Sequence, residues 1–99
     1  MAINLRKEAK GRECQIRASG ICNRDRETVV LAHLNSKGLL GVGMGQKVPD
    51  IFGAWACSAC HDFVDGRVNS KGLTALQIYV LHLEGVLRTQ KILLDEGKI

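Results

Sequence analysis

The sequence predicts a small α+β protein that is stabilised by a metal ion bound to cysteines and ends in a long helix. The chain has 99 residues, a length that fits one domain over residues 1–99. It contains four cysteines and only four aromatic residues, so a thin core would gain from a cross-link or a metal. Near the C-terminus, apolar residues recur with the spacing of a helix.

The composition excludes a disordered chain and a membrane-spanning one. Hydrophobic residues make up 45% of the chain and charged residues 24%, as in ordinary folded proteins. Neither an 18-residue apolar stretch nor a secretory signal after Met1 is present. We therefore expect a cytoplasmic protein with no membrane partner, in which cysteines serve as metal ligands more often than as disulfides.

Positive charge is concentrated towards the N-terminus. The net charge is +4, and residues 1–27 contain seven basic and four acidic side chains, whereas residues 73–99 contain three of each. A basic surface favours nucleic acid, because each neutralised phosphate releases counterions. Charge alone is equally compatible with an ordinary soluble basic protein.

Short elements are expected in the first half of the chain. Leu5–Lys10 can form one or two helical turns that end at Gly11. Cys14–Cys22 is predicted to form a loop or metal knuckle, and Thr28–His33 a strand, because it is rich in β-branched residues. Lys37–Pro49 contains four glycines and is expected to form a long loop or hairpin; its glycine spacing matches no phosphate-binding motif.

Two helices are expected in the second half. Ser58 can cap a short helix that runs to about Asp65 and stops at Gly66. A longer helix is predicted at about residues 73–96 from an apolar stripe with spacings of three, four and seven residues. The stripe consists of Leu73, Leu76, Val80, Leu83, Leu87 and Leu94.

The apolar surface of this long helix has two interpretations. Further apolar residues lie beside the stripe, and the whole surface is expected to pack within the domain. The alternative is the seam of a homodimer through the C-terminal helix. His82, in the middle of the helix, is interpreted as a structural or exposed residue.

The four cysteines form two pairs that together predict one metal site. Cys57 and Cys60 form a C-x-x-C motif, and Cys14 and Cys22 form a more widely spaced pair. Four thiolates complete a tetrahedral zinc site; the alternative is a set of buried thiols without metal. A c-type haem attachment is disfavoured by the missing export signal, and a thioredoxin-like role by the missing βαβ pattern.

Three further residues suggest a second, hydrolytic centre. On a helix, His61 and Asp65 stand at i and i+4 and can hold one divalent cation, leaving positions for water and phosphate oxygens. An isolated pair of this kind can equally be an ion pair. His33, at the end of the predicted strand, is suited to take a proton from water near neutral pH.

These residues and their neighbours resemble the HNH (ββα-metal) endonucleases, and within them the small nucleases of lambdoid phages and prophages. The resemblance extends from Leu5 to Gln90 and is most specific around the C-x-x-C motif. The segments that carry it are Ala32-His33-Leu34, Gly41-Val42-Gly43, Pro49-Asp50 and residues 56–67.

The resemblance implies a zinc-stabilised ββα-metal fold, with its core motif at about residues 12–67, and metal-dependent hydrolysis of DNA phosphodiester bonds. His33 would be the general base, and His61 and Asp65 would hold a catalytic Mg²⁺, Mn²⁺ or Zn²⁺ ion. The four cysteines would hold a structural zinc.

Two positions depart from the pattern of the family. Ala32 stands where a metal-binding Asp or His is common, and Phe52 holds the place of the usual Asn. Asp50 is the nearest polar substitute and Asn35 a more distant one. Asp50 could orient His33, enter the metal shell or act only as a turn residue.

Two functions therefore remain: a DNA endonuclease, and a zinc-stabilised module that binds nucleic acid or protein without catalysis. Ala32 favours the second function, because it removes one expected ligand. For the first, the candidate phosphate contacts flank the site in the sequence; they are Arg17, Lys47, Arg67 and Lys71.

Overall fold

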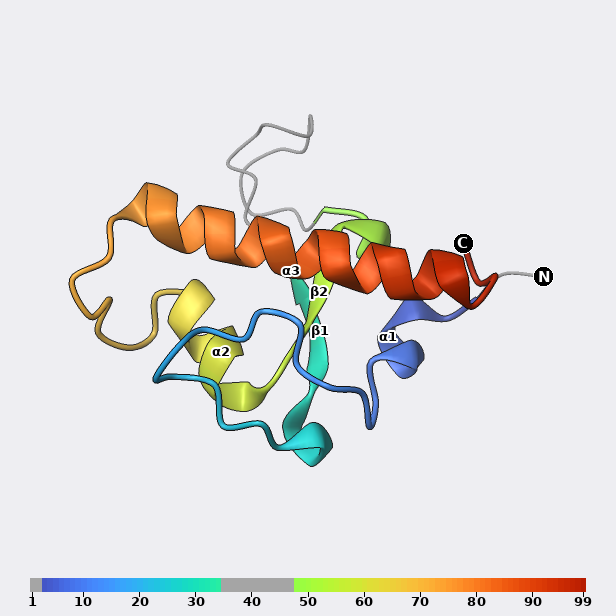
Figure 1. Cartoon of the computed structure of the whole chain (residues 1–99), viewed down its shortest axis with the longest axis horizontal. Coiled ribbons are helices and arrows are strands. Elements are labelled where there is room, and N and C mark those ends of the chain that lie inside the picture. Colours follow the sequence, from blue (N-terminus) through green and yellow to red (C-terminus); the bar gives the residue numbers. More distant parts are fainter. Residues whose placement is uncertain (1–2, 35–47) are drawn as a thin grey trace.

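Helices and a two-stranded sheet make up the computed structural model, which describes residues 3–34 and 48–99 (Figure 1). The α+β class is therefore confirmed. No helix in these two ranges is both long and apolar enough to span a membrane. In chain order the elements are α1 (Leu5–Glu8), the 3₁₀ turn η1 (Arg26–Thr28), β1 (Val30–His33), the 3₁₀ turn η2 (Asp50–Phe52), β2 (Gly53–Ala56), α2 (Ser58–Val64) and α3 (Ala75–Asp95).

The two strands are antiparallel, and β2 leads directly into α2. Val30 pairs with Ala56 at one end of the sheet, and His33 pairs with Gly53 at the other. The sequence did not identify β2 as a strand, because Gly-Ala-Trp-Ala contains no β-branched residue. All four of its residues are buried: Gly53, Ala54 and Ala56 let the sheet lie close to the rest of the protein, and Trp55 fills the core. The resulting order is strand, strand, helix.

The predicted helices are confirmed within one or two residues at each end, with one correction. The N-cap of α2 is Cys57 and not Ser58: the sulfur of Cys57 accepts a hydrogen bond from the backbone N–H of Cys60 at 3.4 Å. Gly66, with φ near +77°, follows α2 as predicted. The expected glycine-rich loop lies outside the described residues, apart from Val48 and Pro49.

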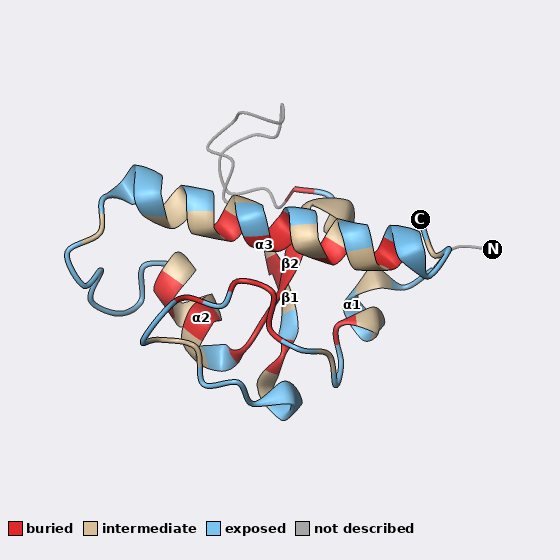
Figure 2. Ribbon diagram, in the orientation of Figure 1, coloured by how far each residue is buried: buried red, intermediate tan, exposed pale blue. Residues whose placement is uncertain are grey.

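Helix α3 crosses the sheet and packs on β2 (Figures 1 and 2). The close approach is made at Gly85, where a Cβ atom would lie 2.8 Å from Cγ1 of Ile16. One turn further on, the hydroxyl of Thr89 accepts a hydrogen bond from the backbone N–H of Trp55 at 3.0 Å and donates one to the carbonyl of Gly85 at 2.9 Å. The buried residues of α3 are His82, Gly85, Val86, Thr89 and Leu93.

The apolar stripe was therefore assigned to the wrong face of α3. Its members Leu76, Val80, Leu87 and Leu94 are 71%, 43%, 56% and 59% exposed. Besides Val86 and Leu93, the fold buries polar and small residues of α3, because backbone groups of the sheet region satisfy the polar side chains and glycine allows close contact. Only Leu73 and Leu83 of the stripe pack partly against the core.

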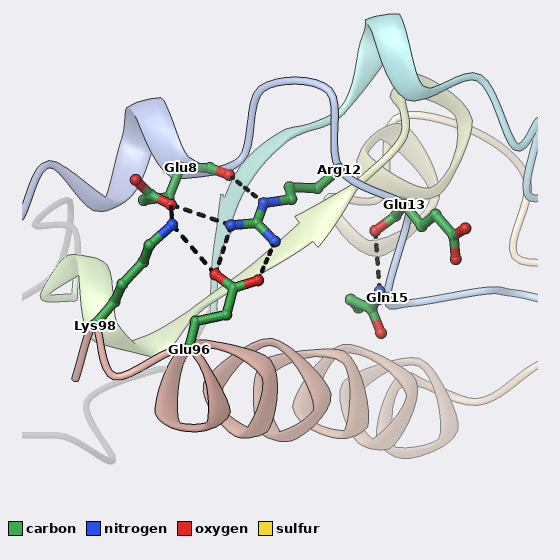
Figure 3. A network of polar contacts seen from close by, with 6 residues as sticks. All are labelled: Glu8, Arg12, Glu13, Gln15, Glu96 and Lys98. Carbon is green, nitrogen blue, oxygen red and sulfur yellow. Dashed lines mark hydrogen bonds and ion pairs between the residues drawn. The ribbon is translucent and has the colours of Figure 1, made fainter.

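An ion-pair network joins α1 to the end of α3 (Figure 3). The guanidinium of Arg12 donates two hydrogen bonds to the carboxylate of Glu96, at 2.6 and 2.7 Å, and two to Glu8, to its carboxylate and its backbone carbonyl, both at 3.2 Å. Lys98 contacts Glu8 at 2.6 Å. Arg12 also lies 4.5 Å from the ring centroid of Trp55, so the network sits directly on the core.

This network predicts a change of stability with pH. Hydrogen bonds from Arg12, above all, lower the pKa of Glu96 from 4.5 to about 2. A carboxyl group with a lowered pKa stabilises the folded state above its usual pKa and loses this contribution as the pH falls through the folded-state value. Glu96→Gln should therefore be less stable than the wild type near neutral pH, and the difference should shrink between about pH 5 and pH 2. Denaturant unfolding at several pH values measures this difference; a constant gap would contradict the account.

Candidate active site and metal centre

The four cysteines, far apart in the sequence, meet at one place beside the N-terminus of α2. Their sulfur atoms all lie within 4.8 Å of one another, and those of Cys22 and Cys57 are 3.8 Å apart. Four sulfurs about 2.3 Å from a tetrahedral zinc ion are separated by similar distances. All four cysteines are free thiols, and three of them are buried. The cluster could therefore hold a metal ion such as zinc.

Hydrogen bonds within the cluster favour the thiolate at Cys14, the form that binds metal. The thiol of Cys60 is the main cause that lowers the pKa of Cys14, to about 4, and backbone N–H groups, including that of Arg17, add to the effect. The same contact raises the pKa of Cys60, because Cys60 is the proton donor. A bound cation would take the place of the shared proton.

Removal of the metal should therefore destabilise the protein. We expect about one zinc ion per purified chain. Cys60→Ser should lose this zinc and lower the unfolding midpoint by more than about 10 °C, because structural zinc contributes several kcal/mol to a domain of this size. Ser70→Ala, an exposed change between α2 and α3, is the control for both measurements. Full stability of the zinc-free wild type would contradict the assignment.

His33 and Asp50 form a hydrogen-bonded pair at the edge of the sheet. His33 is the last residue of β1, and its Nε2 lies 2.7 Å from a carboxylate oxygen of Asp50 in η2. The His33 hydrogen bond is the largest cause that lowers the pKa of Asp50, and the charge of Arg6, whose Nε is 3.3 Å away, adds to it. The ionised carboxylate of Asp50 accepts a hydrogen bond from Nε2–H of His33. In that tautomer Nδ1 carries no proton and can act as a base. Of the three roles considered for Asp50, the geometry favours orientation of His33.

His61 and Asp65 lie on one face of α2, as their spacing predicts. Nε2 of His61 is 3.1 Å from a carboxylate oxygen of Asp65, and both side chains are about one quarter exposed (27% each). Arg67 contacts the same carboxylate at 3.2 Å and also contacts Asp62 at 3.0 Å. A cation at this position would thus compete with the guanidinium of Arg67 for Asp65.

Helix α3 supplies a third histidine, which contacts the backbone next to His33. His82 is 3% exposed, and its Nε2 lies 2.9 Å from the carbonyl oxygen of Ala32, the residue before His33. Burial lowers the pKa of His82, and the charges of Asp65, His61 and His33 also act on it. Residues of both pairs therefore contribute to the electrostatic potential at the buried His82 ring.

The sequence missed this contribution of α3. Besides His82, Gln90 donates a hydrogen bond to the carbonyl oxygen of Ile51 at 2.8 Å, beside Asp50. The available signal was the recurrence of His82, Gly85 and Thr89 along one helical face, a set too polar to read as a core. The two hydrogen bonds fix the backbone on either side of the His33–Asp50 pair.

Within residues 3–34 and 48–99, the cysteines are the one group of three or more metal-binding side chains with closely spaced ligand atoms. His61 and Asp65 would therefore provide two protein ligands, and His33 and Asp50 do not complete a closed site with them. Ala32, where a further ligand is common, is fully buried in the core, so a carboxylate there would be costly.

The predicted phosphate contacts have different surroundings. Arg17 has a left-handed backbone (φ 54°) and donates hydrogen bonds to the carbonyl oxygen of Cys14 and to Gln15, which braces the cysteine loop. It also lines a hollow of about 500 Å³ beside the cysteines, together with Arg24 and Arg26. Lys71 is exposed, and Lys47 lies outside the described residues.

Comparison with known proteins identifies close relatives. The family profile described as "Putative nuclease YbcO" matches residues 3–98. Proteins of that name from Escherichia coli K12 and Enterobacteria phage 82 are each 49% identical to this chain over 96 residues, covering 97% of it and 96% of their own length. A solved structure described as a putative bacteriophage protein from E. coli K-12 MG1655 superposes with a TM-score of 0.76 at 44% identity, covering 95% of this chain and all of that one.

Proposed function

Since this chain belongs to the YbcO nuclease family, we propose that it is a metal-dependent endonuclease of the HNH (ββα-metal) type that hydrolyses phosphodiester bonds of DNA. One observation carries the proposal. The strand–strand–helix unit bears a His33–Asp50 pair at the end of β1 and a His61–Asp65 pair on α2, and the charges of His33, His61 and Asp65 all act on the buried His82.

The proposed reaction uses His33 as the general base. Its Nδ1 takes a proton from a water molecule that attacks phosphorus, while Asp50 holds Nε2 and fixes the orientation of the ring. A divalent cation (Mg²⁺, Mn²⁺ or Zn²⁺) bound by His61 and Asp65 would stabilise negative charge on the phosphate and on the leaving oxygen. Two protein ligands leave coordination positions for water and for phosphate oxygens.

Arg67 has a place in the same proposal. Its guanidinium now pairs with Asp62 and Asp65 on the exposed side of α2. A cation bound by Asp65 would weaken this pairing, and the released guanidinium could then contact a phosphate of the DNA backbone. Arg67 thereby joins cation binding to substrate binding.

The cysteine cluster has a structural role in this proposal. Cys57 lies one turn before His61 and Cys60 directly before it, so zinc at the cluster would fix the direction of the helix that carries the catalytic cation. The thiolates would fill all four positions of the zinc, which leaves no position there for substrate.

The test is a cleavage assay with and without His33. We expect the wild type to cleave DNA when Mg²⁺, Mn²⁺ or Zn²⁺ is added, and His33→Ala to lose about 10²–10⁴-fold in rate, because the proton acceptor is gone. The variant should keep its fold, judged by circular dichroism and zinc content. Lys10→Ala, an exposed change on the basic N-terminal segment, serves as the control.

A second candidate is a zinc-stabilised nucleic-acid-binding module without catalysis. It is favoured by the buried Ala32 and by the pairing of Arg67 with Asp65. Salt-dependent DNA binding without cleavage under any of the three cations would select this candidate and reject the nuclease. Equal cleavage by the wild type and His33→Ala would also reject the proposed base.

His82 has a positioning role in the proposed reaction, acting through the backbone of Ala32. In His82→Gln the amide nitrogen can replace Nε2 as the donor to that carbonyl, whereas in His82→Met the carbonyl is left without it. We expect His82→Met to lower kcat about tenfold or more with little change in KM, and His82→Gln to recover most of it, because a small displacement of a base lowers the rate steeply. Equal kcat values in all three proteins at matched folding would show that His82 only fills space.

A further inference from the structure

Among the described residues, one apolar stripe of α3 is mostly exposed. We define the α3 seam as the row of residues at positions 76, 80, 83, 87 and 94, all Leu except Val80. Four of the five are 43–71% exposed, although they extend over most of a 21-residue helix. Figure 2 shows exposed bands recurring along the length of α3.

The spacing of the α3 seam is that of a helix pair. Steps of four, three, four and seven residues alternate in the way of the a and d positions of a heptad, with Gln90 at the remaining d position. The core does not require this pattern, because α3 buries a different face through His82, Gly85 and Thr89. Scattered exposed leucines are common on proteins, but an ordered row on one helix is typical of an interface.

Charges beside the seam favour a second copy of this chain as the occupant. Glu84 and Lys91 lie one heptad apart on the exposed flank of the seam. A two-fold axis near Leu87 places each Glu84 opposite Lys91 of the partner subunit, so both contacts form at once. Both residues now pair with neighbours on their own helix, Arg88 and Asp95, in exposed contacts that can rearrange at little cost.

From this pattern we propose that α3 pairs antiparallel with α3 of a second copy, through the α3 seam. Leu87 then packs on Leu87 of the partner subunit, and Val80 packs near Leu94 of the partner subunit. A parallel pairing would instead direct Glu84 and Lys91 towards the face of the partner helix that contains Val86 and Leu93. In each copy these two residues are already buried in the core.

The pairing has a consequence that goes beyond the proposed nuclease. The resulting dimer has two-fold symmetry, as does the backbone of duplex DNA, so two copies could present equivalent sites to the two strands. The dimer does not depend on catalysis, and its test measures association alone.

The oligomeric state of the full chain tests the proposal. Light scattering during gel filtration should give twice the monomer mass for the wild type at about 10–100 µM and the monomer mass for Leu87→Glu. Val68→Glu introduces the same charge at another exposed apolar residue, outside α3, and should remain dimeric. A monomeric wild type, or a dimeric Leu87→Glu protein, would overturn the proposal; a monomer would leave the seam to solvent or to another protein.

Charge exchange tests the antiparallel orientation. Glu84→Lys should weaken dimerisation about three- to tenfold, because it faces Lys91 of the partner subunit. Adding Lys91→Glu to it should restore the affinity, since the two signs are then exchanged. A double variant that dimerises as weakly as the single variant would exclude this pairing. Circular dichroism of each variant checks that α3 is intact.

Discussion

The convergence of four cysteine sulfurs is the constraint on which the rest of the structure depends. It joins the loop at Cys14–Cys22 to the junction between β2 and α2, in a chain whose core contains little aromatic surface. Without a cation, the cysteine sulfurs would be buried against one another with no shared ligand. With a bound cation, the cluster would cross-link these two segments of the chain. Since α2 begins at this cluster, the direction of His61 and Asp65 follows from the same contacts.

Helix α3 supplies a second constraint, which acts on the His33–Asp50 pair. Its polar groups bind three backbone positions of the sheet region: His82 at Ala32, Gln90 at Ile51 and Thr89 at Trp55. These are contacts that hydrophobic packing alone would not make, because each has a direction as well as a distance. The helix thus fixes the edge of the sheet where His33 and Asp50 meet, and stability and site geometry share the same hydrogen bonds.

Local spacing was sufficient to predict some parts of this molecule. The C-x-x-C motif and the i, i+4 spacing of His61 and Asp65 depend on geometry within one or two turns, and the structure brings each set together. Other features required knowledge of tertiary contacts. Three of the four residues of β2 are small and have weak strand preference, and the buried face of α3 includes polar groups whose partners lie far away in the sequence. The apolar stripe of α3 therefore lies mainly on the surface, whereas apolar residues beside it, such as Val86 and Leu93, are buried.

We propose that His33 and His61 belong to one cation-dependent centre, separate from the cysteines. The most direct measurement is the broadening of imidazole NMR signals when Mn²⁺, a paramagnetic ion, is added to the zinc-loaded protein. The account predicts that the rings of His61 and His33 broaden together, that Asp65→Asn weakens the effect, and that the zinc content stays constant. Unchanged signals for both rings, or broadening of His61 without His33, would contradict it.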